Sequence, residues 1–386
     1  MRRRIKLNIP TKLPHIGTTI FAVMSKLANE HNALNLSQGF PDFDCDPALV
    51  RLVEKYLRLG HNQYAPMTGL QVLRERVVEK VENSYHAAYD PELEINITPG
   101  ATAALFSAIT AVVHPGDEVI LFEPAYDSYV PAIQLSGGTP VYVKMEFPDY
   151  RINWQDVADK ITSRTRMIIL NSPHNPTGTI LHEDDIAALT ALVTKTDILL
   201  LSDEVYEHIV FDGQEHLSLC SYPQLRERAF VVSSFGKTFH TTGWKTGYCL
   251  APAELMAAFR KVYQFVVYTC NTPVQHAYAE FLGNTDAIAT LAGFYQQKRD
   301  LFLNALQNSR FKALPCDGTY FSMLDYSAIS DEPDYDMARH LTIEHGVAAI
   351  PPSVFYAEQD DHKVLRFCFA KRDETLKHAT EILCAI

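Results

Sequence analysis

Residues 167–206 read MIILNSPHNPTGTILHEDDIAALTALVTKTDILLLSDEVY. This stretch holds two short apolar runs, 167–170 and 198–201, separated by a loop rich in Asn, Pro and Gly and by an amphipathic segment at 183–193. Continuous apolar runs of this length are typical of strands buried on both faces, and the segment between them predicts a helix. A strand, a helix and a second strand make up the repeating unit of a doubly wound α/β fold.

The same alternation extends to both sides of this stretch. Apolar runs at 119–122 and 230–232 add two strands, so the sequence predicts an α/β fold whose mostly parallel central sheet carries helices on both faces. A proline-free segment at 286–307 predicts a long helix that leaves this sheet. Beyond it, residues 319–323 and 364–369 resemble strands that alternate with helices, which indicates a smaller α+β unit.

The length of 386 residues is sufficient for two domains. We predict an N-terminal segment, 1–35, that packs on the small domain, a large domain over 36–285, and a small C-terminal domain over 286–386.

Composition excludes several classes of function. The formal net charge of −12 argues against the concentrated basic surface that nucleic-acid binding needs. The longest apolar runs are of strand length, so no membrane span is expected. Seven cysteines without a CxxC pair argue against a zinc knuckle or a dense disulfide framework, and a reducing cytoplasm is the expected location. Neither HExxH nor a cysteine pair is present, so no metal site is expected.

Polar residues follow the predicted strands at the edge where ligands bind in open α/β sheets. The apolar run 95–97 is followed by TPGAT at 98–102 and then by a helical segment. A glycine turn that exposes backbone N–H groups at a helix N-terminus suits a phosphate, although ordinary helix capping explains the pattern equally well.

Three further strand ends carry candidate side chains. Tyr126 follows the run 119–122, Asn175 lies in the loop after 167–170, and Asp203 and Tyr206 follow 198–201. An acidic residue that ends a buried strand is poorly solvated, so Asp203 is either a structural helix cap or a carboxylate held ionised beside a cation.

The fifth strand end is the segment SSFGKTFHTTGWKTGY at 233–248, which contains Lys237 and Lys245. A single loop lysine is usually just a solvated side chain. Here a phosphate cradle, an aromatic ring, an amide, a carboxylate with a phenol, and an amine converge on one crevice. Pyridoxal 5′-phosphate (PLP) requires this combination, because an amine bonds to its aldehyde and a carboxylate pairs with its pyridine nitrogen.

Eight motifs together resemble those of the PLP-dependent class I aminotransferases of fold type I, and the resemblance covers nearly the whole chain. They are NLSQGFPDF (35–43), NQYAPMTG (62–69), GATAAL (100–105), EPAYDSY (123–129), NSPHNPTG (171–178), SDEVYEHI (202–209), SSFGKTFHTTGWKTGY (233–248) and LRFCFAK (365–371). Within that family, the pattern is most similar to bacterial methionine aminotransferases and to the kynurenine aminotransferase/glutamine transaminase K group.

The resemblance implies cofactor-binding roles. Lys237 is expected to bond to the cofactor aldehyde, and Asp203 to pair with the pyridine nitrogen. Asn175 and Tyr206 are expected to donate to the ring hydroxyl, and Tyr126 to stack on the ring. The residues expected to contact the phosphate are Gly100, Ala101, Thr102, Ser234 and Lys245. Lys245 stands where the aspartate-specific branch has an arginine, so it would contact phosphate as a point charge.

The resemblance also implies substrate contacts and a homodimer with shared active sites. Tyr64 is expected to reach the phosphate of the neighbouring subunit. Arg366 and Gly39, helped by Asn175, are expected to hold the substrate α-carboxylate. Family position puts Ile20, Phe21 and Tyr268 near the side-chain pocket, and simple core packing is an equal explanation for Ile20 and Phe21.

The implied reaction is a ping-pong transfer of the amino group of methionine, or of another large apolar or aromatic amino acid, to a 2-oxo acid. A PLP-dependent C–S β-lyase that acts on cysteine conjugates or cystathionine would use the same residues, so the motifs leave that alternative open. The expected partners are amino acids and 2-oxo acids, a second copy of the chain, no nucleic acid and no membrane.

Overall fold

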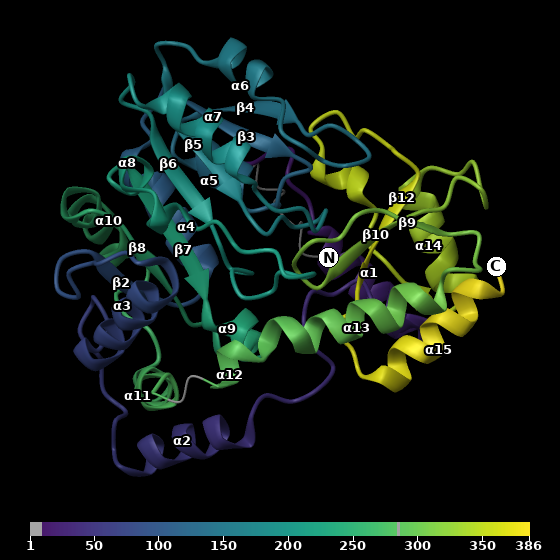
Figure 1. Cartoon of the computed structure of the whole chain (residues 1–386), viewed down its shortest axis with the longest axis horizontal. Helices are drawn as coiled ribbons and strands as arrows, with labels where there is room; N and C mark the ends of the chain where they lie inside the picture. Colours follow the sequence, from purple (N-terminus) through teal and green to yellow (C-terminus); the bar gives the residue numbers. More distant parts are fainter. Residues whose placement is uncertain (1–9, 284–285) are drawn as a thin grey trace, which may run out of the picture.

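The computed structural model of the chain describes residues 10–283 and 286–386, so residues 1–9 of the predicted N-terminal segment lie outside the description. Its largest element is a seven-stranded sheet (Figure 1). The strands, in spatial order, are β2 (Ile95–Thr98), β8 (Gly247–Leu250), β7 (Ala229–Ser234), β6 (Leu199–Asp203), β5 (Thr165–Asn171), β3 (Glu118–Glu123) and β4 (Thr139–Lys144). Only β8 runs antiparallel to its neighbours within this sheet.

Alternate side chains of the strands enter two different hydrophobic cores. In β5, Met167 and Ile169 join one core, while Ile168 and Leu170 join the other. The first core is covered by α4 (Ala101–Val112), α5 (Tyr129–Leu135) and α10 (Ala253–Val266). The second is covered by α3 (Gln71–Tyr85), α6 (Trp154–Lys160), α7 (Glu183–Val193), α8 (Pro223–Arg226) and α11 (Thr272–Phe281), with α2 (Pro47–Arg58) against α11. The predicted parallel sheet with helices on both faces is confirmed.

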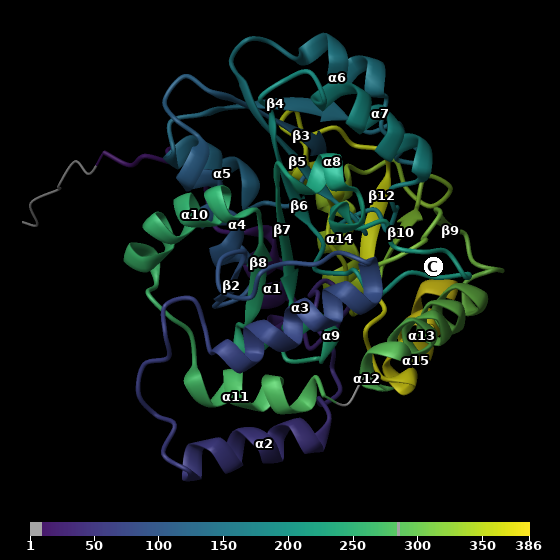
Figure 2. The same cartoon turned by 60° about the vertical axis from the view of Figure 1, so that its left-hand side comes forward.

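A smaller antiparallel sheet forms beside the first, with the order β12 (Val364–Cys368), β10 (Phe321–Asp325) and β9 (Lys312–Ala313). Around it lie α13 (Leu291–Ala305), α14 (Asp334–Glu344) and α15 (Asp373–Cys384), and Figure 2 shows α13 and α15 side by side. Near the N-terminus, α1 (Ile20–Glu30) contacts α14, and β1 (Leu34–Asn35) pairs in parallel with β11 (Val347–Ala348). The division of the chain at 35 and 285 stays a prediction.

The observed element boundaries differ from the sequence expectations at two places. The long helix predicted over 286–307 is two helices, α12 (Asp286–Ala289) and α13, and this expectation is wrong. The break falls at Thr290, a β-branched residue whose φ and ψ are −89° and −10°. The strand predicted at 319–323 begins only at Phe321, because Thr319 has a φ of 67°, which no strand accommodates.

None of the helices in the described part of the chain combines the length and the apolar composition needed to cross a lipid bilayer.

Candidate active site

A cavity of about 200 Å³ opens at the carboxyl ends of β5, β6 and β7, facing the smaller sheet. Asn171, Asp203 and Ser234, which are the last residues of these three strands, all line it. Besides Asp203 and Ser234, the predicted residues that line it are Phe21, Gly39, Gly100, Ala101, Thr102, Tyr126, Asn175, Tyr206, Lys237, Lys245 and Arg366. A cavity is therefore present at the edge of the sheet where ligands were expected.

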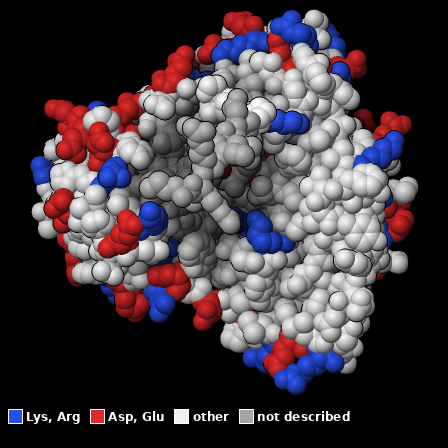
Figure 3. All heavy atoms as spheres, turned by 180° about the vertical axis from the view of Figure 1, so that it is seen from behind, with Lys and Arg blue, Asp and Glu red and all other residues white. Residues whose placement is uncertain are grey.

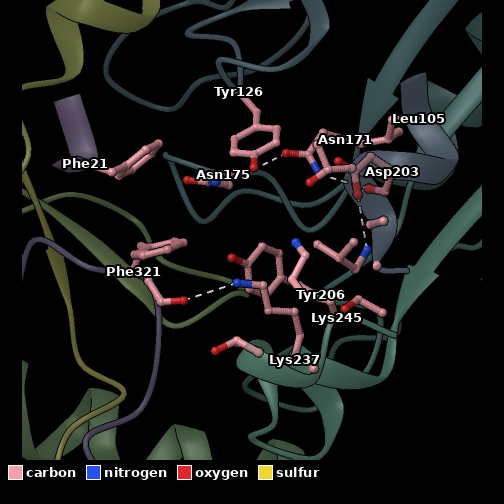
Figure 4. Close-up of a pocket in the computed structure, with 18 of the residues that line it drawn as sticks. Phe21, Leu105, Tyr126, Asn171, Asn175, Asp203, Tyr206, Lys237, Lys245 and Phe321 are labelled. Carbon is pink, nitrogen blue, oxygen red and sulfur yellow. Dashed lines mark hydrogen bonds between the residues drawn. The ribbon is translucent and has the colours of Figure 1, made fainter. Parts of the chain in front are cut away.

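Figure 4 shows how the labelled side chains face this cavity. Lys237 and Lys245 extend into it from below, Tyr126 and Asp203 lie across from them, and Phe321 forms part of its left wall. Groups of opposite charge and an aromatic ring thus share one hollow, although they come from distant parts of the chain.

Lys237 stands on α9 (Phe235–Thr238), the single helical turn after β7. Its Nζ donates to the backbone oxygen of Gly39 at 3.1 Å and to the Tyr320 hydroxyl at 2.8 Å. Burial lowers the pKa of Lys237 to about 8, since an enclosed site disfavours the ammonium form. About one tenth of this amine is therefore neutral at pH 7, far more than for a solvated lysine, and an amine must be neutral to accept a proton.

Asp203 is buried, and burial raises the pKa of its carboxyl to about 6. The Tyr129 hydroxyl donates to its Oδ2 at 2.7 Å and opposes this shift. A carboxylate in this position favours a cationic group beside it, because the cation would restore the ionised form.

The N-terminus of α4 and Lys245 form a cradle for an anion. Gly100, the residue before α4, has a φ of 83°, and a Cβ there would lie 3.4 Å from Lys245 Nζ. The backbone N–H groups at this helix end and the ammonium of Lys245 present positive charge to the cavity. Thr102 and Lys245 are exposed, so the cradle is open to solvent on one side.

Arg366 on β12 is fully buried, and its guanidinium lies 3.9 Å from the centroid of the Phe321 ring. It donates to Asn175 Oδ1 at 2.7 Å and to the backbone oxygen of Ser37 at 2.9 Å. Its Nε has no hydrogen-bond partner within the described residues. Burial lowers the pKa of Arg366 to about 10, which leaves it charged at neutral pH. A buried cation with an unused donor fits a carboxylate ligand.

Gly39 allows the loop after β1 to approach this clamp. A Cβ at Gly39 would lie 2.7 Å from Cζ of Phe321, so a larger residue would displace the ring that packs on Arg366. The glycine thus keeps its own backbone oxygen within reach of Lys237.

Tyr206 and Tyr126, the other two residues predicted to contact the cofactor ring, differ in burial. Tyr206 is fully enclosed, and its ring meets that of Tyr320 edge-on at 5.1 Å. Tyr126 is half-buried, and burial raises its pKa to about 12. Both phenols are therefore protonated at neutral pH and can donate a hydrogen bond.

Three predicted residues do not line the cavity within one chain. Tyr64 is 83% exposed and Tyr268 is 47% exposed, and their rings meet edge-on at 5.5 Å. Ile20 is half-buried and packs against the core around the smaller sheet. The roles expected for these three residues stay predictions.

The sequence did not single out three residues that support the site. Asn171 accepts a hydrogen bond from the Asn175 backbone and donates to the Asp203 backbone oxygen at 2.8 Å. Tyr129 lies three residues after Tyr126. On a helix, this spacing places two side chains on the same face, so it could have indicated that Tyr129 also lies near the site. Tyr320 carries no such signal, since it reaches Lys237 from a segment 83 residues away.

A family model of the class I and II aminotransferases matches residues 31–383. The chain belongs to this family. This aminotransferase is 52% identical to methionine aminotransferase of Escherichia coli strain K12 over 97% of both chains. It is 35% identical to the kynurenine–oxoglutarate transaminase of Dictyostelium discoideum, over 95% of this chain and 94% of that one. The crystal structure of Escherichia coli YbdL, described as having a methionine aminotransferase function, superposes with a TM-score of 0.97 at 51% identity, covering 98% and 100% of the two chains.

These matches confirm the predicted family and the predicted fold. Among the described residues of this aminotransferase, no group of three or more His, Cys, Asp or Glu side chains is placed to hold a metal ion.

Proposed function

We propose that this aminotransferase uses PLP to move the amino group of methionine, or of another large apolar or aromatic amino acid, to a 2-oxo acid. The observation that carries the proposal is the convergence of an amine of lowered pKa, Lys237, a buried carboxylate, Asp203, and a buried guanidinium, Arg366, on one cavity. The similarity to the methionine aminotransferase of Escherichia coli supports the choice of donor.

The residues fit PLP at both ends of the molecule. The cradle of Gly100, the first turn of α4 and Lys245 suits its phosphate, and Ser234 adds a hydroxyl at the end of β7. Asp203 suits its pyridine nitrogen, because a protonated nitrogen would offset the cost of burying the carboxylate. Tyr206 and Asn175 would donate to the ring hydroxyl, and Tyr126 would cover the ring.

PLP supplies an aldehyde that bonds to amines and a ring that draws electrons away from the substrate α-carbon. Lys237 would hold the cofactor before substrate arrives, and its amine, when free, would take the proton from the α-carbon. Its lowered pKa suits this task, since a general base works best when its pKa lies close to the working pH.

Arg366 binds the α-carboxylate and so fixes the α-hydrogen relative to Lys237. Its guanidinium and the neighbouring Asn175 amide, which both line the cavity, would provide donors for two carboxylate oxygens. The amino donor and the oxo acid carry the same carboxylate, so both are expected to use Arg366 in turn. Because one clamp serves both substrates, they bind one after the other, which is a ping-pong order.

The walls near Arg366 favour apolar side chains. The Phe21 and Phe355 rings lie 5.9 Å apart beside the guanidinium. Within the described residues, the basic side chains that line the cavity are Lys237, Lys245 and Arg366, and each already has a role. Asp127 lies near Arg366, and burial raises its pKa. An acidic substrate side chain would therefore find repulsion and no free cation.

The proposed homodimer would complete the open side of the cradle. Tyr64 and Tyr268 lie together on the surface, as does Phe265 of α10, which is 86% exposed. Figure 3 shows that the right-hand part of the rear face carries few charged side chains. Exposed aromatic rings on a surface poor in charge are typical of protein interfaces, and Tyr64 and Tyr268 would then face the partner's cavity.

Single-turnover assays with the PLP-loaded enzyme test the proposal. We expect methionine, phenylalanine and tyrosine to yield their 2-oxo acids, and aspartate and glutamate to react at least about a hundredfold more slowly. Lys237→Ala should lower the rate by more than about a hundredfold, because no other side chain replaces its amine. Full activity of that variant would overturn the assignment of Lys237.

The same assays distinguish the C–S β-lyase. A β-lyase releases pyruvate and ammonia from a cysteine conjugate without needing a 2-oxo acid acceptor. A faster release of pyruvate than conversion of methionine would replace the proposed reaction with this alternative.

A further inference from the structure

The free amine of Lys237 is held by two oxygen atoms from two other parts of the chain. One is the backbone oxygen of Gly39, 3.1 Å from Nζ, and the other is the hydroxyl oxygen of Tyr320, at 2.8 Å. Tyr320 is fully buried just before β10. A phenol that touches the reacting nitrogen can act on the reaction directly, so its hydrogen bonding is informative.

The direction of each hydrogen bond follows from the donors available. The Tyr320 hydroxyl is 2.5 Å from the backbone oxygen of Gly39, and a carbonyl oxygen only accepts, so the phenol donates its one hydrogen there. Its lone pairs are then left for the amine of Lys237. The three groups form a closed triangle in which every donor hydrogen has an acceptor.

This triangle fixes the orientation of the amine. A neutral lysine amine has two N–H bonds and one lone pair. With one N–H directed to Gly39 and the other to Tyr320, the lone pair takes the remaining tetrahedral direction and does not rotate. Only a lone pair aimed at the substrate α-hydrogen can accept that proton, so the alignment matters for rate.

Neighbouring rings hold Tyr320 in place. Its ring packs against those of Phe321 at 5.0 Å, Tyr206 at 5.1 Å and Tyr295 at 5.6 Å. Phe321, the next residue, stacks on Arg366. Adjacent residues of one segment therefore support the amine and the carboxylate clamp.

We propose that Tyr320 is a positioning residue, whose hydroxyl orients the free amine of Lys237 for proton transfer. The inference rests on the proposed role of Lys237. Tyr320 has no assigned role in cofactor or substrate binding. Its hydroxyl also interacts with that of Tyr206, so the test reads the protonation of Nζ directly.

Other groups also influence the protonation of Lys237. The charged and titratable groups that act on it are Cys368, Arg366, Lys245 and Asp203, with the phenols of Tyr206 and Tyr320 beside it. Replacing Tyr320 by phenylalanine leaves all the others in place. The substitution Tyr320→Phe also keeps the ring and so preserves the packing.

The test uses the full-length enzyme loaded with pyridoxamine 5′-phosphate, which cannot bond to Lys237. Trace acetylation with acetic anhydride, read by mass spectrometry of the peptide that contains Lys237, reports the neutral amine across about pH 6 to 10. We expect a midpoint near the pKa of about 8 in the natural enzyme. In Tyr320→Phe the midpoint should fall by about one pH unit, because the ammonium form loses an acceptor.

A single-turnover assay with the PLP-loaded enzyme and methionine gives the second readout. The rate on the high-pH plateau should fall about tenfold or more in Tyr320→Phe, with the KM for methionine unchanged. If the substitution only lowered the pKa of Lys237, more of the amine would be neutral at low pH and the reaction there would be faster. The combination of a lower midpoint with a slower plateau therefore identifies lost orientation.

Tyr295→Phe is the matched control. Tyr295 is equally buried and touches the Tyr320 ring, but its hydroxyl has no hydrogen-bond partner within the described residues. Both readouts should match the natural enzyme. If Tyr320→Phe also matches it, the inference is wrong while the proposed function stands. If the natural enzyme converts no amino acid, or if Lys237→Ala does so, the proposed function itself fails.

Discussion

Asp203 and Lys237 are shifted away from their charged forms by the same cause. Burial raises the pKa of the carboxyl to about 6 and lowers that of the amine to about 8. For Lys237 the shift is useful, since it creates a neutral base. For Asp203 the shift has a cost that a protonated pyridine nitrogen would remove. Both shifts fit the proposed cofactor, whose protonated ring would complete the site.

Tyr129→Phe removes the hydroxyl that donates to Asp203 at 2.7 Å. The pKa of Asp203 should rise above about 6, so the charge is lost at a higher pH as the solution is acidified. We expect the dissociation constant for PLP to increase about tenfold, and the weakening to begin at a higher pH than in the natural enzyme. An absorbance titration with PLP at several pH values measures both effects.

Tyr263→Phe serves as the control for this experiment. Tyr263 is buried in the same core as Tyr129, and its hydroxyl has no partner in the part of the chain that the structure describes. Equal PLP affinities and equal pH profiles for the two variants would contradict a role of Tyr129 in tuning Asp203.

The sequence predicted the residues at the strand ends because their neighbours are local in the chain. Asp203, Ser234 and Lys237 each follow an apolar run by two to five residues. Tyr129 and Tyr320 were missed for different reasons. Tyr129 sits in a predicted motif without a stated partner, whereas Tyr320 meets Lys237 only through packing of the two sheets, which no local pattern encodes.

The elements around the site are joined by a buried polar network behind Lys237. Glu207, in the loop after β6, accepts hydrogen bonds from Lys80 of α3, Ser233 of β7, Tyr248 of β8 and Tyr85 of α3. Although burial favours its protonated form, Lys80 and these donors lower the pKa of Glu207. One carboxylate therefore ties together the ends of strands that carry Asp203 and Lys237.

Lys80→Met should destabilise the fold by about 3–5 kcal/mol, because the substitution leaves the buried Glu207 carboxylate without its cation. Urea unfolding followed by circular dichroism measures the change. Adding Glu207→Gln to Lys80→Met should recover part of the loss, since the uncompensated charge disappears.

Lys55→Met is the comparison for this pair. Lys55 also pairs with a glutamate, Glu280, at 2.6 Å, but both side chains are exposed. Its replacement should leave the unfolding midpoint nearly unchanged, because solvent screens surface pairs. Equal destabilisation by the two lysine variants would count against the network.

Element boundaries could be predicted where a hydrophobic pattern ends at a turn residue. The segment expected at 183–193 is α7, and the run 167–170 lies inside β5. The two failures, at Thr290 and Thr319, each concern the local backbone around one threonine. Backbone angles are set by the packing around the residue and leave no mark in the hydrophobic pattern.

At the scale of the whole molecule, residues 10–283 and 286–386 form three hydrophobic cores, two on the faces of the seven-stranded sheet and one around the smaller sheet. The cavity lies where they meet, with Lys237 next to the second core and Arg366 within the strands of the third. The α/β class and the small α+β unit could be predicted from the sequence. The relative orientation of the two sheets could not be predicted from the sequence. The apolar periodicity of a segment shows which of its faces is buried, but not how one sheet is oriented against another.

A mixed dimer tests the proposed sharing of sites. Neither Lys237→Ala nor Tyr64→Ala should support full turnover as a homodimer. In a hybrid of the two chains, one site would contain an intact Lys237 and an intact Tyr64 from the partner, so the hybrid should regain about half of the natural activity. Differently tagged, co-expressed chains allow its purification. If Tyr64 served its own subunit's site, the hybrid would contain no complete site and would stay impaired.

The placement of Arg366 and Lys237 on separately packed cores has an evolutionary consequence. A substitution far from the cavity, at the seam between the two sheets, would slide the clamp relative to the base by a fraction of an ångström and so retune which amino acids fit. Natural variants could broaden or narrow their range of amino-acid substrates in this way while every residue that touches the substrate stays the same.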